Sequence, residues 1–441
     1  MFMHFERAIL ALTICLLAAL VGASPQALAA NDVQILITVA NDSEKEGALF
    51  RDMQRSGAVY SQYEINHRAT AVLRRIARKY ALAEPEASWQ VDSLGEYCAV
   101  YSLGGSSDVE DLLDEIRSDP EVASVQRMVT YRAASLSAAS PVRTPADKRD
   151  GSADLAQERL RATNLTYNDP YFERQYAEST AAVEDMHRLS RGSGVTIGLI
   201  DTIVDRKHAD FKGLTLRTKS TVPRGISTSR DMTHGTAMLG VIAAQPANGT
   251  GVVGLAPAAE VLSLGACWYP LESGTAVCNS LSIAAALDLA LQESVDIINM
   301  SLAGPRDPLV ERVINKVLAR GALVIASDPL EGENRFPAKL PGVVAVSNVK
   351  PAREDANSSS GVDNAELSSI RKADAWNASI ATGELLSTAP FGTYDFYTGA
   401  SVSSAFATGL VALYLSGDRG DTLKKTFAEE LSRFHFEYQV D

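Results

Sequence analysis

The strongest constraint on the fold is a series of short apolar runs, rich in β-branched residues, in the second half of the chain. They are Val195–Ile200, Val261–Leu264, Val295–Met300, Ala322–Ile325 and Val343–Val346. Such runs are typical of parallel strands that are buried on both faces. Helical stretches lie between them, near His234–Ala244, Leu281–Gln292 and Leu309–Arg320. This alternation predicts an α/β fold, in which a parallel sheet carries helices on both faces.

The preceding part of the chain, residues 31 to about 133, has a different pattern. Its residues predict strands and helices in the order β-α-β-β-α-β, a split βαβ plan in a small α+β unit. The expected elements are Gln34–Val39, Ala69–Leu82, Trp89–Leu94, Cys98–Leu103, a helix capped by Asp108 and ending at Ile116, and Val122–Tyr131. We therefore expect two structured units of different fold class.

The ends of these units follow from composition. Arg7 precedes an apolar run, Ala8–Ala23, and small residues follow up to Ala30, which is the layout of a secretory signal peptide. An uncleaved signal anchor is the alternative. Residues 134–165 are rich in Ser, Ala, Arg and Asp and predict a flexible linker. The predicted organisation is a signal peptide (1–30), a small α+β domain (31–133), a linker (134–165) and an α/β domain (166–441).

Charge and cysteine content narrow the possible partners. The formal net charge is −13 without long single-sign runs, which argues against nucleic-acid binding. No later segment is apolar enough for a membrane span, so we expect a soluble mature protein after signal cleavage. Export favours disulfides, and Cys267 and Cys278 would close a short loop. The alternative is that these two and Cys98 remain thiols, and no cysteine or histidine cluster has zinc-site spacing.

Chemistry is concentrated in three segments of the α/β domain. Asp201 directly follows an apolar run, His234 opens an apolar helix, and Ser401 follows Gly399-Ala400 at the start of another helix. Sites in open α/β sheets form at the carboxyl ends of strands, where all three residues can meet. A serine hydroxyl needs an imidazole to take its proton, and the imidazole needs a carboxylate to orient it. Each residue alone has an ordinary structural explanation, but the set in this order predicts acyl transfer.

These three segments resemble the Asp, His and Ser motifs of the subtilisin family of serine proteases, which have this chain order. Further similarity lies in Asn248–Pro257, Ile297–Gly304, Phe336–Ala338 and the thermitase-like opening Asn168–Tyr176. The similarity extends over about residues 166–416. The resemblance implies a subtilisin-like parallel sheet with helices on both faces, preceded by a small α+β propeptide domain. It also implies a secreted or periplasmic serine endopeptidase made as an autoprocessed zymogen.

The resemblance assigns further residues by position. Ser301, Leu302, Ala303 and Gly304 would pair as a strand with an extended peptide, and Ala326 and Ser327 would border the adjacent pocket. The expected partners are protein or peptide substrates and the chain's own propeptide as an intramolecular inhibitor, in a monomer. The end of the propeptide, near residues 131–134, would lie in the substrate cleft in the way that a cleavage product does.

A structural calcium site is also implied, because carboxylate and carbonyl oxygens suit this cation. The matching residues are Asp169, Asp210, Asn248 and the main-chain carbonyls of Gln245, Thr250 and Val252. Alternatively, Asp169 and Asp210 are ordinary turn residues.

One departure from the family pattern concerns catalysis. The spacing to Phe336-Pro337 puts Asp328 where the family has the asparagine that completes the oxyanion hole. In this family, loss of that donor costs roughly 10²–10³ in kcat. An ionised carboxylate would repel the oxyanion, whereas a protonated Asp328 would donate to it and favour activity at acidic pH. The alternative is therefore a catalytically impaired pseudoprotease or a peptide-binding protein. Ile203 and Ala400 are milder departures that leave the three catalytic groups in place.

Overall fold

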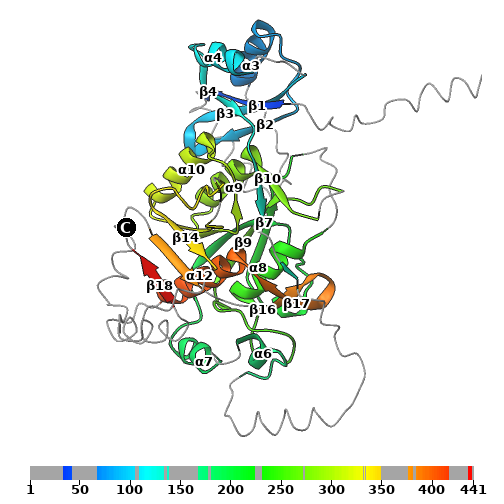
Figure 1. Ribbon diagram of the computed structural model, residues 1–441, viewed down its shortest axis with the longest axis vertical. Helices are drawn as coiled ribbons and strands as arrows, with labels where there is room; N and C mark the ends of the chain where they lie inside the picture. The colour runs from blue at the N-terminus through cyan, green and yellow to red at the C-terminus, as the bar shows by residue number, and fades with distance from the viewer. Residues whose placement is uncertain are drawn as a thin grey trace, which may run out of the picture.

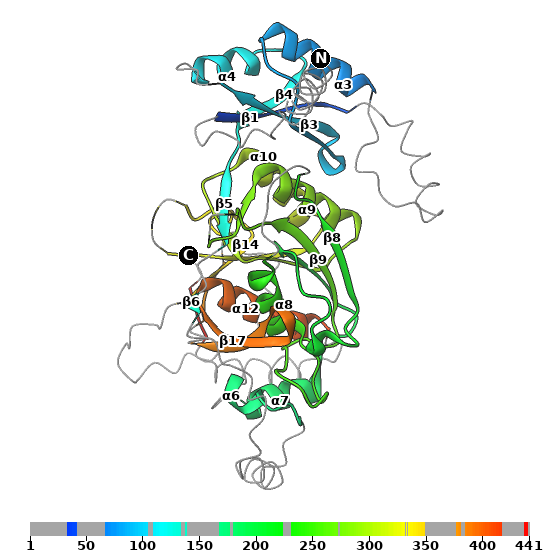
Figure 2. The same ribbon diagram turned by 90° about the vertical axis from the view of Figure 1, so that its right-hand side faces the viewer.

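The structure is a computed structural model. It describes residues 33–41, 67–104, 109–133, 137–138, 167–176, 180–223, 231–271, 274–330, 332, 334–348, 376–380, 384–416 and 436–439. The predicted signal peptide, the predicted cap Asp108 and most of the predicted linker lie outside the described residues. The described part consists of a small domain above a larger α/β domain, joined by an extended strand (Figures 1 and 2).

The larger domain is built on an eight-stranded sheet. Its strands, in order across the sheet, are β18 (Phe436–Gln439), β15 (Trp376–Ile380), β14 (Val343–Ser347), β13 (Leu323–Ser327), β11 (Ile297–Met300), β7 (Thr196–Thr202), β9 (Glu260–Cys267) and β8 (Leu216–Ser220). The neighbours from β15 to β8 are parallel, and the edge strand β18 is antiparallel to β15. The predicted apolar runs thus form the centre of the sheet.

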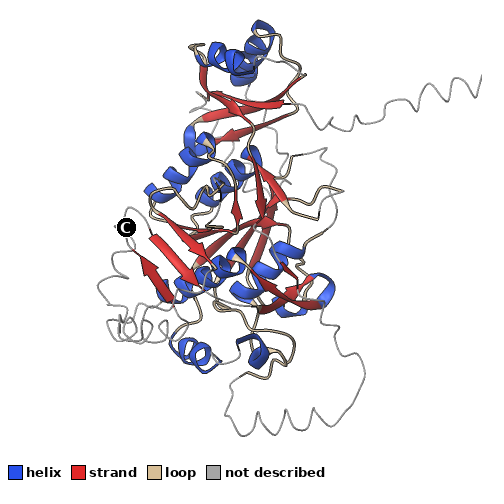
Figure 3. Ribbon diagram, in the orientation of Figure 1, coloured by secondary structure: helices blue, strands red, loops and turns tan. Residues whose placement is uncertain are grey.

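Helices cover both faces of this sheet, as Figure 3 shows. They are α8 (Thr233–Ala243) and α12 (Ala400–Leu415) on one face, and α9 (Ser280–Gln292) and α10 (Pro308–Ala319) on the other. Strand residues alternate between two buried clusters: Ile297 packs with the α8 and α12 side, and Ile298 with the α9 and α10 side. Two-sided burial explains why these strands are apolar at every position.

Smaller elements surround the α8 and α12 face. They are α6 (Phe172–Tyr176), α7 (Thr180–Leu189), η3 (Ala209–Phe211), β16 (Leu385–Ala389), η4 (Pro390–Gly392) and β17 (Thr393–Thr398). The β16–β17 hairpin packs on α8, where Gly240 allows a close approach because a Cβ there would lie 2.2 Å from Thr388 Oγ1. We did not expect this hairpin or β8 from the sequence, since polar residues interrupt these segments and they form neither continuous apolar runs nor a regular alternation.

The small domain follows the expected β-α-β-β-α-β order. It contains β1 (Val33–Ala40), α3 (His67–Lys79), β2 (Ala87–Val91), η1 (Asp92–Leu94), β3 (Glu96–Leu103), α4 (Val109–Arg117) and β4 (Val122–Arg127). The antiparallel sheet has the strand order β2-β3-β1-β4, and its helices cover one face. The expected strand Trp89–Leu94 is shorter than predicted, because Asp92–Leu94 forms a 3-10 turn.

The predicted last strand, Val122–Tyr131, is in fact two strands in two sheets. β4 ends at Arg127, and β5 (Thr130–Ala133) leaves the small domain and runs down to the larger one (Figure 2). There it lies between β10 (Val277–Asn279) and β12 (Leu302–Ala303), antiparallel to both. A single segment therefore belongs to the sheets of both domains.

The predicted disulfide between Cys267 and Cys278 is present, and it ties β10 to β9. Cys98 is a buried free cysteine in the small domain. Among the described residues, no helix is both long enough and apolar enough to span a lipid bilayer.

Candidate active site

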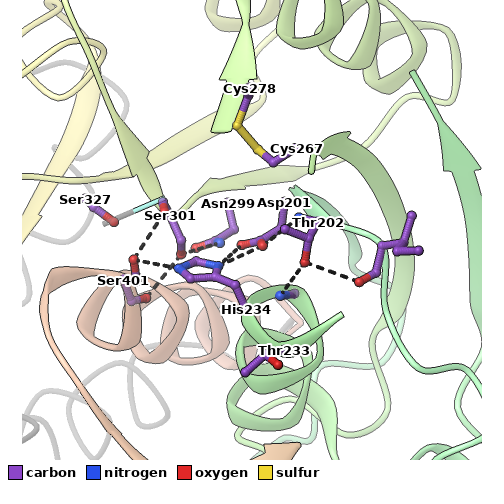
Figure 4. A network of polar contacts seen from close by, with 12 residues as sticks. Asp201, Thr202, Thr233, His234, Cys267, Cys278, Asn299, Ser301, Ser327 and Ser401 are labelled. Atoms are coloured by element: carbon purple, nitrogen blue, oxygen red, sulfur yellow. Dashed lines mark hydrogen bonds and ion pairs between the residues drawn. A yellow bond between two sulfur atoms is a disulfide. The ribbon is translucent and has the colours of Figure 1, made fainter. Parts of the chain in front are cut away.

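The three predicted catalytic side chains meet at the carboxyl edge of the sheet (Figure 4). His234 Nδ1 donates to Asp201, at 2.7 Å from Oδ1 and 2.9 Å from Oδ2. His234 Nε2 lies 3.1 Å from Ser401 Oγ. With its proton on Nδ1, the imidazole presents Nε2 as an acceptor to the hydroxyl, which is the arrangement that general-base catalysis requires. All three residues are almost completely buried.

The close approach of α8 to β7 sets the position of His234. Gly235 N donates to Thr202 Oγ1 at 2.9 Å, and a Cβ on Gly235 would lie 2.5 Å from the carbonyl oxygen of Thr202. Glycine is therefore needed next to the histidine. Thr202 N also donates to Asp201 Oδ1 at 2.7 Å, so the residue after the aspartate holds both the carboxylate and the helix that carries the imidazole.

Ser401 is fixed by a second set of hydrogen bonds, on the side away from Asp201. Its Oγ lies 3.1 Å from the carbonyl oxygen of Ser301, and Ser301 Oγ donates to the carbonyl oxygen of Ser401 at 3.1 Å. Asn299 Nδ2 donates to Ser301 Oγ, and Thr408 Oγ1 donates to Asn299 Oδ1. This buried network locks the end of β11 against the first turns of α12. Gly399, with φ 122°, makes the sharp entry to that helix.

Strands β10 and β12 together form a strand-binding site, here called the groove, which holds β5 and begins next to Ser301, the residue in contact with Ser401. Leu302 pairs with Ala133 and Ala303 with Arg132, so β5 occupies the strand position that the sequence assigns to a bound peptide. Gly304 pairs with Phe336 at the end of this groove. Ala326 and Ser327 lie at the end of β13, and Ser327 Oγ contacts Ser404 Oγ of α12 at 3.1 Å.

A second segment of the chain pairs with the strand that precedes Ser401. The short strand β6 (Ser137–Ala138) pairs antiparallel with β17, with Ser137 opposite Thr398 and Ala138 opposite Tyr397. Only residues 134–136 separate β5 from β6 along the chain. β5 thus pairs with Leu302, next to Ser301, and β6 pairs with Thr398, three residues before Ser401.

Asp328 is held by a cation that sequence reasoning missed. Arg335 binds both carboxylate oxygens, with Nε donating to Oδ1 at 2.7 Å, and Leu330 N donates to Oδ1 at 3.0 Å. Burial raises the pKa of Asp328, but the hydrogen bonds from Arg335 and Leu330 outweigh it, so the pKa lies below its ordinary value. The structure therefore contradicts the interpretation in which a protonated Asp328 donates at mildly acidic pH, because Arg335 stabilises the ionised form.

The residues matched to a calcium site gather around the loop after α8. Asn248 Nδ2 lies 2.9 Å from the carbonyl oxygen of Gln245 and 3.4 Å from Asp210 Oδ1. Thr250 Oγ1 and Val252 N donate to the Asp210 carboxylate, and Asp169 Oδ2 accepts from Ala247 N.

Two features of this loop fit a hard cation. Burial, and to a smaller degree the charge of Asp210, raises the pKa of Asp169 to about 6. Burial thus disfavours the ionised carboxylate, and a neighbouring cation would stabilise it. The oxygen donors suit calcium, although among the described residues no three His, Cys, Asp or Glu side chains gather as a metal site.

A buried carboxylate, imidazole and hydroxyl at the edge of a parallel sheet, next to a strand-pairing groove, define the class of α/β proteins with a Ser-His-Asp triad. Consistent with this, a model of the subtilase family matches residues 192–429. The chain belongs to the subtilase family.

Similarity to known proteins supports the assignment of the chain to this family. The chain is 31% identical to subtilisin E of Bacillus subtilis (strain 168) over 235 residues, which cover 51% of this chain and 56% of that protein. It is 26% identical to thermitase of Thermoactinomyces vulgaris over 263 residues, or 58% of this chain and 87% of thermitase. The chain thus spans little more than half the length of subtilisin E. The crystal structure of fervidolysin from Fervidobacterium pennivorans has the same fold, with a TM-score of 0.59 at 18% identity, over 87% of this chain and 55% of fervidolysin.

Breaking the pair between Arg335 and Asp328 should destabilise the protein in a pH-dependent way. A depressed carboxyl pKa contributes stability above the unfolded-state pKa of about 3.9, and this stability is lost as the pH falls through the folded-state pKa. Arg335→Gln should therefore lower the free energy of unfolding by about 2 kcal/mol at pH 7, and by much less near pH 3. Urea unfolding at both pH values measures this difference.

Arg306→Gln is the matched control. Arg306 pairs with Glu311 on the surface, so its loss should leave the unfolding midpoint unchanged. Equal destabilisation by both variants, or a loss for Arg335→Gln that persists at pH 3, would contradict this role of the pair.

Proposed function

We propose that this chain is a serine endopeptidase that is synthesised as a zymogen and cleaves itself. The observation that carries the proposal is the Asp201–His234–Ser401 relay, with hydrogen bonds of 2.7 Å and 3.1 Å linking its members. Membership of the subtilase family supports it. Protein or peptide segments in extended conformation are the proposed substrates, because the groove offers strand pairing through Leu302 and Ala303.

In the proposed mechanism, Ser401 Oγ attacks the carbonyl carbon of the scissile bond while His234 Nε2 takes the hydroxyl proton. Asp201 stabilises the resulting imidazolium and keeps its orientation. His234 then gives the proton to the leaving amine, and the C–N bond breaks to leave an acyl-enzyme on Ser401. A water molecule, deprotonated by His234, then attacks the acyl carbon. The ester bond to Ser401 Oγ breaks, His234 returns the proton to this oxygen, and the carboxylate product is released.

The proposed inhibitor is the small domain together with β5. β5 pairs with β12 and β6 pairs with β17, close to Ser401 along the chain, and we propose that the peptide bond to be cut lies between Ala133 and Ser137. An intact chain in this position is a substrate before cleavage and a blocking product afterwards. This accounts for the burial of the relay, with Ser401 fully inaccessible.

Specific polar contacts support a stable complex between the small domain and helices α9 and α10. The Asp288 carboxylate of α9 accepts from Asp92 N and Ser93 N at 3.1 and 2.8 Å, and so caps the 3-10 turn η1. Arg312 of α10 binds both carboxylate oxygens of Glu96. Val129 N donates to Ser280 Oγ at 2.8 Å. The contacts of Asp288 and Arg312 lie outside the strand pairing of β5, so we propose that the domain stays bound after the chain is cut.

Purified full-length chain should cut itself, and the Ser401→Ala variant should not. The mature fragment should begin at one of residues 134–137, unless further trimming of the segment up to about residue 165 follows. Because the segment is already in the groove, cleavage is expected to be first order, with a rate constant that is unchanged by tenfold dilution. Gel electrophoresis and N-terminal sequencing of the product test this.

Two outcomes would contradict the proposal. Cleavage that persists in Ser401→Ala would point to a contaminating protease. A wild-type chain that stays intact and does not react with a fluorophosphonate would favour a peptide-binding protein without activity.

Asp328 is the observation that favours the impaired alternative. An ionised carboxylate at the oxyanion position opposes the negative charge that develops on the substrate oxygen. We propose a slow but active enzyme, because Arg335 neutralises this carboxylate through both oxygens.

The variant Asp328→Asn should accordingly raise kcat at neutral pH by about tenfold or more, since it removes the negative charge and supplies an amide donor. The measurement is peptide hydrolysis at pH 7 by the mature enzyme after the bound small domain has been removed, with urea unfolding as the control for folding. An unchanged or lower kcat in a folded variant would mean that residue 328 does not face the oxyanion.

We also propose a structural calcium ion at the loop after α8, held by Asp169, Asp210, Asn248 and the carbonyls of Gln245, Thr250 and Val252. The ion would compensate the buried carboxylates. In the Ser401→Ala chain, a chelator should lower Tm by about 5–10 °C relative to buffer with calcium at 100 times its Kd. Asp210→Asn should reduce this difference, and a Tm that is insensitive to the chelator would exclude the ion.

The compartment and oligomeric state remain predictions from the sequence. We propose an exported protein, secreted or periplasmic, that acts as a monomer. The disulfide between Cys267 and Cys278 supports export, because such bonds persist in oxidising compartments.

A further inference from the structure

Strand β10 supplies most of the strand pairing in the groove. It opposes three residues of β5, Thr130, Tyr131 and Arg132, whereas β12 opposes two. Ala133 N also donates to the carbonyl oxygen of Ala276, directly before β10, at 3.0 Å. An extended peptide that takes the place of β5 therefore binds best when β10 is already in position.

Without β5, β10 is a short strand with limited support of its own. It has three residues, and its neighbour within its own sheet is β5. In the described part of the chain, the other edge of β10 is bound by backbone hydrogen bonds between Val277 and Trp268, both of 2.8 Å. At its end, Asn279 caps α9 by accepting from Ser282 N. A two-stranded pair of this kind is at best marginally stable in water.

The disulfide fixes this strand to the body of the larger domain. Cys278 is the middle residue of β10, and Cys267 is the last residue of β9, which belongs to the eight-stranded sheet. Cys267 is aligned with Thr202 of β7, the residue that follows Asp201. The covalent bond therefore sets the place of β10 relative to the strand that carries the carboxylate of the relay. Figure 4 shows the disulfide together with the relay.

The loop that the disulfide closes also packs with the bound strand. Cys267 and Cys278 are 11 positions apart in the sequence. Within this loop, Tyr269 is buried and belongs to a small apolar cluster with Ala276 and with Ala133 of β5. The bond thus restrains both the strand that pairs with β5 and a side chain that packs beside it.

We propose that the Cys267–Cys278 disulfide is a positioning element that holds β10 ready for an extended peptide substrate. The enzyme then binds peptides well only while this bond is intact, whereas the chemistry at Ser401 does not depend on it. The inference rests on the proposed peptidase function and assigns a role in substrate binding to the two cysteines. A strand that is held in its binding conformation increases affinity, because less conformational entropy is lost when the peptide binds.

The cysteine content makes the test specific to this bond. The chain has four cysteines, and two of them, Cys15 and Cys98, lie before the proposed cleavage site. The mature enzyme therefore contains Cys267 and Cys278 alone. Dithiothreitol reduces their bond to two thiols and is itself oxidised to a cyclic disulfide, so that two electrons and two protons pass to the protein. Thiol titration before and after the treatment shows whether the bond has been reduced.

Two substrates separate peptide binding from catalysis. A quenched fluorescent peptide with the sequence of residues 128–139 reaches β10, whereas p-nitrophenyl acetate reacts with Ser401 and is too small to reach that strand. On reduction, mature enzyme freed from the small domain should lose about tenfold in kcat/KM for the peptide, with a raised KM and a kcat that changes by less than about twofold. Hydrolysis of the ester should also change by less than about twofold.

Two variants give the same comparison without a reductant. Cys267→Ala/Cys278→Ala should raise KM for the peptide as reduction does. Its self-cleavage should persist, because β5 is part of the same chain and has a high effective concentration at the groove. Met186→Ala is the matched control. This buried side chain belongs to α7, at the end of the larger domain away from the small domain (Figure 1), so its loss should lower Tm and leave KM unchanged.

The outcomes separate this inference from the proposed function. An unchanged KM for the peptide after reduction and in the double variant, an equal loss of activity on the peptide and the ester, or a similar rise in KM for Met186→Ala would overturn the positioning role. Each of these results would leave the peptidase function intact. Oxidised enzyme that hydrolyses neither substrate, together with a full-length chain that does not cut itself, would overturn both.

Discussion

The candidate active site depends on how closely helix α8 can approach strand β7. The hydrogen bond between Asp201 and His234 joins the end of a buried strand to the second residue of a helix, and Gly235 permits the contact because it has no side chain. Thr202 connects the two partners through its N–H and its hydroxyl. Helix α12 then places Ser401 Oγ beside His234 Nε2. The hydrogen bond from Ser301 Oγ to the carbonyl oxygen of Ser401 holds the start of this helix in place. The parallel sheet thus brings the three residues to one edge, and Gly235 allows α8 to come close enough to β7 for the hydrogen bond between His234 and Asp201.

The second organising element is the segment β5, which belongs to both domains. It continues from β4 of the small domain and becomes the central strand between β10 and β12 of the large one. Its backbone hydrogen bonds are thus satisfied by the groove that it blocks. The small domain, from which β5 extends, is itself held by α9 and α10 through η1 and Glu96. These contacts reduce the conformational entropy that β5 must lose when it enters the groove. This division explains how a strand of four residues can occupy the groove without a long interface of its own.

Sequence patterns predicted those parts of the fold and site that depend on local context. The central strands were evident as apolar runs, and Asp201, His234 and Ser401 each stand at the boundary of such a run or helix. The sequence did not predict Arg335 as the partner of Asp328, because their contact depends on how the loop between them folds rather than on periodicity. The division of Val122–Tyr131 into β4 and β5 was missed for a similar reason. Both strands have the residues of a half-buried strand, and only the tertiary structure decides that the second joins another sheet.

Two carboxylates close to the groove illustrate how the same group acquires opposite roles from its neighbours. Asp328 has both oxygens engaged by a guanidinium, so its charge is compensated and its pKa is lowered. Asp307 has one oxygen bound to the start of α10, and its other oxygen is buried without a hydrogen-bond partner. A buried acceptor of that kind costs free energy until a donor arrives. The two carboxylates thus differ in satisfaction: the charge of Asp328 is compensated through both oxygens, whereas Asp307 keeps one buried oxygen unpaired at the start of α10.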